Sequence, residues 1–497
     1  MASDPTSRDS IGYLRAGSRA VVTARGLGRG LRFLLHVVVG RILGPADFGI
    51  YMVALSALII AQKLILLGLD RVGIRYGGIL ISHAGHRERA RFLMVIVGGA
   101  LVIGAAGAGI IAVGASTWAR ALAIPGSGEL VLTLGLGLPL LTLFLALSGL
   151  LRGSHRPGTE AVWAEFVTPG LNILLLFALP FAPGVDTWTN LQVVAVAFLA
   201  SHVLPTIGMG LRAASDYLGE RARDVATRVL PPASEVRTFA IGVWTVGAVT
   251  VLLARVDRLL VAQFLSPEAV GLYAAAAVLA QQNAFFVQSI AAVAAPRFAL
   301  LERQGDDEAL TEAAGRVEEW TAIISMPVVL VTILLAPDLL GLLGPEFRAG
   351  AMVLVILTLS QAVNVLTGAS GAVLNMTGGE RDNVLASGIG LIAMLAMVSL
   401  GAARYGLPGA AFGSGVAWAT VWVTQRRAMT RRTGPSFPAF GIPSLAIPTV
   451  AGTVAGVACI WTMDPGIPRI VVTGALTLAV YASVVALLRG RTRTGEP

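Results

Sequence analysis

Residues 45–51 read PADFGIY and residues 267–273 read PEAVGLY, so one Pro-x-x-x-Gly-x-Tyr element occurs twice in the 497-residue chain. The two copies are 222 residues apart. The dipeptide Ser-Gly at 148–149 returns at 370–371 with the same offset of 222 residues. Two matches at one offset indicate an internal duplication, and they predict two halves with the same succession of elements.

The composition around these elements is strongly apolar. Hydrophobic residues make up 55% of the chain and charged residues only 13%, whereas soluble domains carry about 25% charged residues. A soluble core cannot bury so much apolar surface, so the composition indicates a chain that lies in lipid. The net charge of +9 would suggest nucleic-acid binding in a soluble protein. Here the arginines fall mostly in short loops between apolar runs, and we predict no nucleic-acid partner.

Apolar runs that could cross a bilayer, which takes about 20 residues each, predict fourteen transmembrane helices. They lie near 22–43, 50–75, 92–114, 129–150, 160–182, 189–211, 239–262, 270–294, 318–341, 347–369, 383–403, 408–425, 442–462 and 468–488. The repeat places six helices in each half, which gives both halves one orientation and predicts a pseudo-twofold axis along the membrane normal, with a cavity between two lobes.

The predicted architecture is therefore an all-α polytopic membrane protein with two six-helix lobes and two C-terminal helices. We expect an N-terminal lobe at 1–212, a cytoplasmic linker at 213–237, a C-terminal lobe at 238–430, and two additional helices with a cytoplasmic tail at 431–497.

Arginine placement orients this architecture. Cytoplasmic loops carry an excess of Lys and Arg, and in this chain the arginines concentrate in alternate loops, Arg152 and Arg156 among them. This alternation predicts cytoplasmic N- and C-termini in a cell (plasma or inner) membrane. The first residues contain no apolar segment followed by a small-residue cleavage site, so we predict no removable signal peptide.

The first predicted helix carries the strongest candidate site. Arg25, Arg29, Arg32 and His36 are four, three and four residues apart, and at 3.6 residues per turn they share one helix face. An arginine at the bilayer centre costs about 2.5–3.5 kcal/mol, so the stripe must face water, a counter-charge or an anionic ligand. The alternative is that Arg25 and Arg29 only set topology at the cytoplasmic surface. His36 by itself would more often be a buried histidine than a ligand.

The second predicted helix adds Lys63, the only lysine of the chain, and Asp70 two turns further on the same face. A cavity-facing position would make Lys63 another substrate-binding group. Asp70 is either a structural charge partner or an ion-coupling residue, and the sequence leaves both roles open.

The seventh predicted helix ends in Arg255, Asp257 and Arg258. Topology does not explain these arginines, because they lie toward the outer side, where positive charge is disfavoured. At the 222-residue offset Arg258 corresponds to His36, so both halves place a potential cation at one depth. We expect Arg255 and Arg258 to bind substrate and Asp257 to be the second candidate for ion coupling.

Other polar groups suggest structural roles. Glu160 and Glu165 open the fifth predicted helix, where carboxylates complement the helix N-terminus. Cys459 is the only cysteine, so no internal disulfide can form, and no Cys/His metal spacing exists. The sequence predicts neither a metal nor a cofactor.

Four segments carry a family resemblance: ILGPADFGIYMVALSALIIAQKLILLGLDRVGIRYG at 42–77, VDRLLVAQFLSPEAVGLY at 256–273, LGPEFRAGAMVLVIL at 343–357 and YGLPGAAFGSGVAW at 405–418. They resemble the polysaccharide-biosynthesis, O-antigen-flippase-type proteins of the multidrug/oligosaccharidyl-lipid/polysaccharide exporter superfamily. The resemblance covers about residues 12–485. These motifs are structural and not catalytic, so they specify the fold better than the substrate.

The resemblance implies a V-shaped pair of six-helix lobes that works by alternating access. It also implies a flippase that carries a polyprenyl-(pyro)phosphate-linked oligosaccharide from the cytoplasmic to the outer leaflet. The arginine stripe suits the anionic carrier. The expected partners are this substrate, membrane lipids and glycan-assembly enzymes, and the expected state is a monomer.

Three other functions remain open at this point. A drug or cation antiporter would call for carboxylates in the cavity, opposite in sign to the first helix. A membrane-embedded polymerase or glycosyltransferase would call for a large outer loop or paired carboxylates near the outer surface, so we predict that the chain is not an enzyme. An export accessory without transport is the third.

Overall fold

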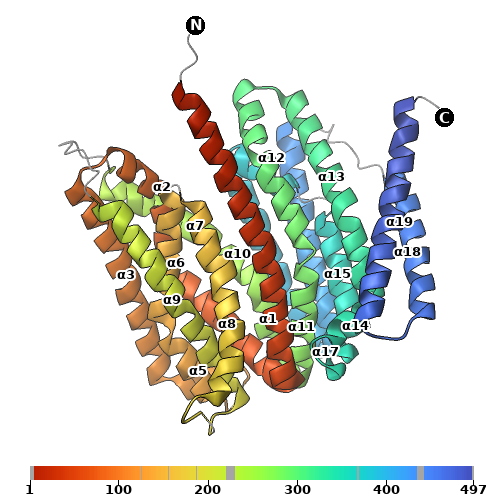
Figure 1. Ribbon diagram of the computed structural model, residues 1–497, viewed down its shortest axis with the longest axis horizontal. Coiled ribbons are helices and arrows are strands. Elements are labelled where there is room, and N and C mark those ends of the chain that lie inside the picture. Colours follow the sequence, from red (N-terminus) through yellow and green to blue (C-terminus); the bar gives the residue numbers. More distant parts are fainter. Residues whose placement is uncertain are drawn as a thin grey trace. The chain divides into compact units, whose positions relative to one another are not determined.

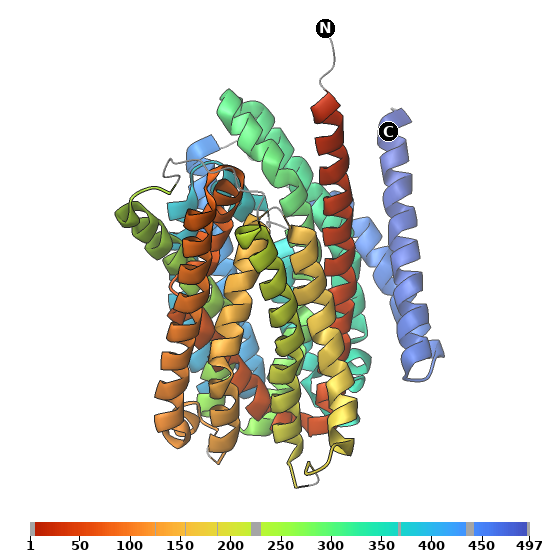
Figure 2. The same ribbon diagram turned by 60° about the vertical axis from the view of Figure 1, so that its left-hand side comes forward.

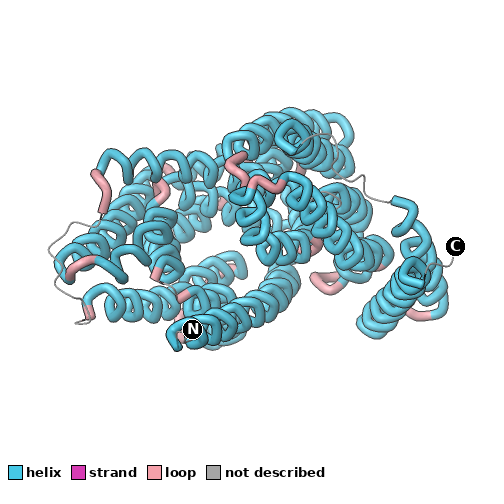
Figure 3. The backbone as a smooth tube through the Cα atoms, turned by 90° about the horizontal axis from the view of Figure 1, so that it is seen from above, coloured by secondary structure: helices cyan, strands magenta, loops and turns pink. Residues whose placement is uncertain are grey.

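The computed structural model describes residues 5–124, 126–154, 156–185, 187–219, 230–365, 369–433 and 442–494. Within these ranges the chain is helical and has no strand (Figure 3). The predicted all-α class is thereby confirmed.

The chain forms two compact units. Unit 1 comprises Met1–Leu43 and Ile50–Arg255, and unit 2 comprises Gly44–Gly49 and Val256–Pro497. The boundary falls inside one helix, α10 (Ala233–Phe264). The lobe limits expected from the sequence, with a linker at 213–237 and a separate segment at 431–497, stay predictions.

Unit 1 is built around α6, which packs against α2, α3 and α9 (Figures 1 and 2). Its elements are most of α1 (Pro5–Ile65), α2 (Leu69–His83), α3 (His86–Val113), α4 (Ala115–Ala121), α5 (Gly128–Leu136), α6 (Leu138–Gly153), α7 (Pro157–Ala161), the π-helical turn η1 (Val162–Val167), α8 (Thr168–Ala178), the 3-10 turn η2 (Leu179–Phe181), α9 (Asn190–Leu218) and the first part of α10. The buried core includes Leu80, Ile96, Leu150, Met209 and Tyr217.

Small residues bring α2 and α6 together. A Cβ at Gly149 would collide with the carbonyl oxygen of Asp70, and one at Gly153 would collide with that of Gly73. Spacing of this kind, with small residues four apart, lets helix backbones approach closely in membranes. The glycine of the repeated Ser-Gly dipeptide is therefore required here by packing, and it fixes the register of the neighbouring Ser148 and Arg152 on α6.

The helix predicted at 50–75 is two helices in the structure. Leu67 and Gly68 have φ angles of 50° and 81°, values that end a right-handed helix. As a result α1 ends at Ile65 and α2 begins at Leu69. This correction has a local cause, because Gly68 adopts the left-handed conformation that glycine tolerates best.

Unit 2 contains the remainder of α10 and all later elements. These are α11 (Pro267–Gln281), α12 (Ala284–Gln304), α13 (Asp307–Leu334), α14 (Ala336–Gly341), the 3-10 turn η3 (Pro345–Gly350), α15 (Ala351–Val365), α16 (Ala369–Met376), α17 (Glu380–Thr433), α18 (Ile442–Thr462) and α19 (Ile467–Thr494). α18 and α19 pack on each other, and both contact α13.

The two copies of the Pro-x-x-x-Gly-x-Tyr element meet inside unit 2. A Cβ on Gly49 would collide with the carbonyl oxygen of Pro267, and a Cβ on Gly271 would collide with that of Pro45. Such a reciprocal contact, in which each copy offers the same group to the other, is typical of twofold symmetry. The repeated glycines are thus explained by the close approach of two backbones.

Ten helices in the described ranges are long and apolar enough to cross a membrane, or up to eleven if the bent pair Gly128–Leu136 and Leu138–Gly153 counts as one span. Two of the ten, Gly26–Ile65 and Glu380–Arg432, are each interrupted by non-helical backbone, at Gly44 and Gly406. Ala446–Thr462 is a shorter apolar helix. The protein is a multi-pass membrane protein, while the count of fourteen spans stays a prediction.

Candidate functional site

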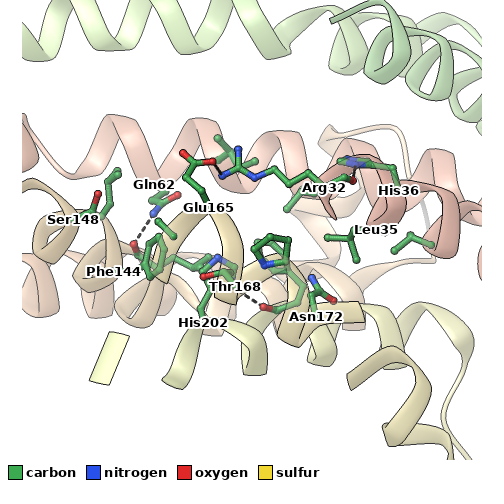
Figure 4. A pocket seen from close by; sticks show the side chains of 18 of the residues that line it. Arg32, Leu35, His36, Gln62, Phe144, Ser148, Glu165, Thr168, Asn172 and His202 are labelled. Carbon is green, nitrogen blue, oxygen red and sulfur yellow. Dashed lines mark hydrogen bonds and ion pairs between the residues drawn. The ribbon is translucent and has the colours of Figure 1, made fainter. Parts of the chain in front are cut away.

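Unit 1 contains a cavity of about 470 Å³ that combines cationic, anionic and neutral polar side chains. Helices α1, α6, α8 and α9, the turns between α6 and α8, and the last residue of unit 1 contribute to its wall (Figure 4). The polar residues that line it are Arg32, His36, Tyr51, Gln62, Ser148, Arg152, Glu160, Glu165, Thr168, Asn172, His202 and Arg255. We call it the unit 1 pocket.

Arg32 and Glu165 form an ion pair across this pocket, between Nη2 and Oε2 (Figure 4). Their side chains are 45% and 21% exposed. The contact depends on the close approach of α1 to η1, because a Cβ at Gly28, one turn before Arg32, would collide with the backbone carbonyl of Glu165. Gly28 thus allows the close approach of the two backbones, and Arg32 forms the ion pair that this approach makes possible.

The π-helical turn η1 directs Glu165 into the pocket that Glu160, in α7 just before the turn, also lines. Glu160 and Glu165 are five residues apart, a spacing that points side chains to different faces of an α-helix. In a π-helix the hydrogen bonds run between residues five apart, so the wider turn at Val162–Val167 lets both glutamates line the pocket. π turns are frequently found at functional sites.

Glu160 is held more firmly than Glu165. Its side chain is 1% exposed, and its Oε1 accepts a 2.7 Å hydrogen bond from Ser148 and a 2.6 Å bond from Arg152 Nη2. Arg152 also interacts electrostatically with Glu165. The two pairs therefore form one charged network that joins α1, α6, α7 and η1.

Two histidines and an amide complete the pocket near Arg32. His36 Nδ1 lies 2.6 Å from the carbonyl oxygen of Arg32. His202 packs against the rings of Phe144 and Phe198, with centroid distances of 5.0 and 4.7 Å. Gln62 donates a 2.6 Å hydrogen bond to a backbone carbonyl of α6. These contacts orient polar groups at the pocket wall.

The structure distributes the predicted stripe unevenly. Arg32 and His36 line the unit 1 pocket, whereas Arg29 is half-buried on α1 and is not among the lining residues. Arg25 lies in α1, but its side chain is outside the part of the chain that the structure describes. Arg255, predicted from the seventh helix, also lines this pocket.

Lys63 and Asp70 pair with each other and do not line the unit 1 pocket. Lys63 Nζ lies 2.6 Å from Asp70 Oδ2, and Arg71 Nε lies 3.7 Å from the same oxygen. The pair joins the end of α1 to the start of α2 across the break at Leu67 and Gly68. The sequence placed both residues on one face of one helix, and the tertiary contact forms although the helix is interrupted.

Asp257 and Arg258 belong to unit 2 and are enclosed there. Arg258 is fully buried, and its Nη1 lies 3.2 Å from Asp257 Oδ1. The hydroxyl of Tyr273, from the second repeated element, donates a 3.2 Å hydrogen bond to the other oxygen of Asp257. This arrangement ties α10 to α11.

Sequence reasoning gave three pocket residues other roles. The loop pattern indicates a topology signal at Arg152, and the position of Glu160 and Glu165 indicates a helix N-terminus. Acidic side chains five apart within a predicted membrane helix were a usable signal, because such groups are rare unless they pair or function. Among the described residues no group of three or more His, Cys, Asp or Glu side chains could hold a metal ion.

The chain matches a protein-family model over more than half of its length. The family model described as polysaccharide biosynthesis protein matches residues 14–302. No curated protein sequence matches the chain.

Solved structures match most of the chain. The lipid II flippase MurJ in an inward closed conformation has a TM-score of 0.73 at 12% identity and covers 93% of this chain and 98% of its own. An inward-facing multidrug resistance transporter of the MATE family, from the MOP superfamily, has a TM-score of 0.64 at 15% identity, with coverages of 82% and 96%. A MOP-superfamily transporter from Pyrococcus furiosus, described as having a binding pocket of reverse polarity, has a TM-score of 0.59 at 16% identity, with coverages of 83% and 96%. The chain therefore shares the fold of these membrane proteins.

Proposed function

We propose that this chain, which belongs to the polysaccharide biosynthesis protein family, moves a polyprenyl-(pyro)phosphate-linked oligosaccharide from the cytoplasmic to the outer leaflet of a cell membrane by alternating access. The family match and the MOP-superfamily fold support a membrane flippase or exporter. The lipid-linked oligosaccharide is the finer part of the proposal, and it depends on the chemistry of the unit 1 pocket.

One observation carries this substrate class: Arg32, His36, Arg152 and Arg255 line one pocket inside a membrane-spanning unit. Guanidinium groups grip phosphate oxygens in bidentate fashion, and a lipid diphosphate brings such oxygens to membrane depth. Neutral hydrogen-bonding groups of the same pocket, including Gln62 and the buried Asn172, suit sugar hydroxyls. Both chemistries of the proposed substrate thus find counterparts in one cavity.

The carboxylates of the pocket argue against a cationic substrate. Glu160 and Glu165 are the acidic residues that line it, and each is paired with an arginine. A cation would have to compete with these guanidinium groups for its counter-charge. An anionic substrate, in contrast, would take the place of these carboxylates as the partner of the arginines.

The test of this proposal is an Arg32 series in a strain that lacks its own flippase for surface polysaccharide. Arg32→Ala should lower surface polysaccharide at least about tenfold, because a hydrogen-bonded charged partner is worth about 1.5–3 kcal/mol. Arg32→Lys should lose less but still a substantial part, since lysine is only a point charge. A membrane-expression blot corrects for protein level.

Arg120→Ala is the matched control. Arg120 is an exposed arginine of α4 that does not line the unit 1 pocket, and its loss should leave transport near the wild-type level. Full activity of the Arg29→Ala/Arg32→Ala double variant at normal expression would refute the proposed phosphate site.

The proposed orientation, with both termini in the cytoplasm, is tested by cysteine accessibility in a Cys459→Ala background. The cysteines are introduced at exposed non-glycine positions. The nearby glycines Gly184, Gly305 and Gly344 are avoided, because their positive φ angles would strain a substituted side chain. Thr187→Cys and Ala349→Cys should react with an impermeant maleimide in intact cells, and Gln304→Cys should not. Labelling of Gln304→Cys in sealed cells contradicts the orientation.

A further inference from the structure

The two arginine–glutamate pairs of the unit 1 pocket differ in how tightly the glutamate is enclosed, while both arginines are partly exposed. Glu160 is almost completely buried and accepts hydrogen bonds from two side chains. Glu165 and Arg32 are both partly exposed, and their ion pair is open to the pocket (Figure 4). Ion pairs between partly exposed groups contribute little free energy, whereas a buried carboxylate with several donors is costly to disturb. One pair is therefore fixed and the other is displaceable.

We propose that Glu165 is an internal competitor for the substrate's phosphate: it holds Arg32 until the diphosphate takes its place. This inference rests on the proposed function and adds a regulatory and selective element to the same site. Glu165 is here a specificity-determining residue, and it acts through its ion pair with Arg32.

The chemistry of the exchange follows from the shared geometry of the two anions. A carboxylate and a phosphate both offer paired oxygens to the fork of a guanidinium group. Arg32 cannot give its full set of donors to both, and the two negative charges repel each other at contact distance. Substrate binding therefore requires that Glu165 withdraw from Arg32.

This exchange makes the pocket selective for strongly charged anions. A neutral molecule gains nothing that offsets the broken ion pair, and a cation is repelled by the arginines that remain. A diphosphate carries more negative charge than a carboxylate, so it competes for Arg32 better than a singly charged anion does. The displaced Glu165 remains within the field of Arg152, which limits the cost of its release.

The position of Glu165 on the π-helical turn supports this role. In an unbroken α-helix the side chains of Glu160 and Glu165 would be about 140° apart around the helix axis. The turn Val162–Val167 aims the second carboxylate at Arg32 while Glu160 stays with Arg152. The turn thus places the displaceable carboxylate beside Arg32, while α7 holds the structural one.

The experiment measures binding of inorganic pyrophosphate to the purified full-length protein in detergent by titration calorimetry. Glu165→Gln keeps the side-chain shape and removes the competing charge, so pyrophosphate should bind about two- to fivefold more tightly. Arg32→Ala should weaken binding about tenfold or more. In the Arg32→Ala background, Glu165→Gln should change affinity by less than about twofold, because the two residues are coupled.

Two further variants serve as controls for this experiment. Glu302→Gln removes one exposed carboxylate in unit 2, matches the change in net charge, and should leave the affinity unchanged. Glu165→Asp retains the charge on a shorter side chain and should give an intermediate gain. It also carries the test if Glu165→Gln does not elute as a folded protein in size-exclusion chromatography.

The outcomes separate this inference from the function beneath it. If pyrophosphate binding depends on Arg32 but is unchanged or weakened by Glu165→Gln, the competitor role is overturned and the phosphate site stands. A gain of equal size in the Arg32→Ala background overturns it in favour of general charge repulsion. If wild type and Glu165→Gln both fail to bind, or Arg32→Ala binds as well as wild type, the phosphate site falls and the competitor falls with it.

Discussion

Equivalent positions in the two copies of the repeat have different surroundings. His36 lines the unit 1 pocket beside Arg32, whereas Arg258, its counterpart 222 residues later, is fully buried against Asp257 in unit 2. At the same offset Ala254 corresponds to Arg32, and Leu374, part of a buried apolar cluster, corresponds to Arg152. At these positions the first copy has side chains that line the unit 1 pocket, whereas the second copy has an enclosed cation or an apolar side chain.

The difference teaches how one fold uses charge in two ways. A buried charge that is enclosed by its partners holds helices in place and cannot reach a ligand. Partly exposed charges contribute little stability, and for that reason they can exchange partners. By this criterion we propose that the binding chemistry lies in unit 1 and that the Asp257–Arg258–Tyr273 group of unit 2 is structural.

The largest expected effect breaks the enclosed pair. Arg258→Ala leaves Asp257 buried without its guanidinium partner, and we expect a loss of about 3–5 kcal/mol in stability. Arg32→Ala should cost less than about 1 kcal/mol, because the Arg32–Glu165 pair is partly exposed. Thermal unfolding of both variants in one detergent, followed by intrinsic fluorescence, measures the difference. Equal melting temperatures would contradict the contrast between the two units.

A smaller effect compares the two glutamates of the pocket. Glu160→Gln removes a buried charge that accepts hydrogen bonds from Ser148 and Arg152, and we expect a loss of about 1–3 kcal/mol in stability. Glu165→Gln should change stability by less than about 1 kcal/mol. The same thermal assay decides the order, and Glu165→Gln melting below Glu160→Gln would show that the more exposed pair is the structural one.

The smallest expected effect on stability is that of Asp70→Asn, a variant that also tests ion coupling. Asp70→Asn keeps an acceptor for Lys63 and should cost about 1 kcal/mol. If Asp70 titrates during transport, the variant loses the dependence of transport on the ion gradient, which is measured with and without an ionophore. Asp257→Asn is the parallel variant in unit 2. Unchanged gradient dependence in both variants would leave the two aspartates as structural ion-pair partners.

The stripe on α1 shows how far sequence reasoning reached at the site. Helical spacing placed Arg32 and His36 on one face, and the structure places both at one pocket. It could not show that Arg32 meets Glu165, 133 residues further along the chain, because the wide turn that aims Glu165 leaves no periodic signal. Arg258 illustrates the opposite case: its type and depth suggested a ligand-binding cation, while its burial depends on neighbours that spacing does not reveal.

The sequence by itself determined that this is an all-helical, multi-pass membrane protein with an internal repeat, and it also indicated the family of the protein. The reason is that lipid leaves no alternative partner for backbone polar groups, so long apolar runs must become helices, and a duplication stays visible as matched residues at one offset. Only the tertiary structure decided which charges pair, which are enclosed, and which line a cavity. Those outcomes depend on how closely helices approach at residues such as Gly28 and Gly149, and on the π-helical turn that redirects one glutamate. Each is a contact between segments far apart in the chain, which no local pattern encodes.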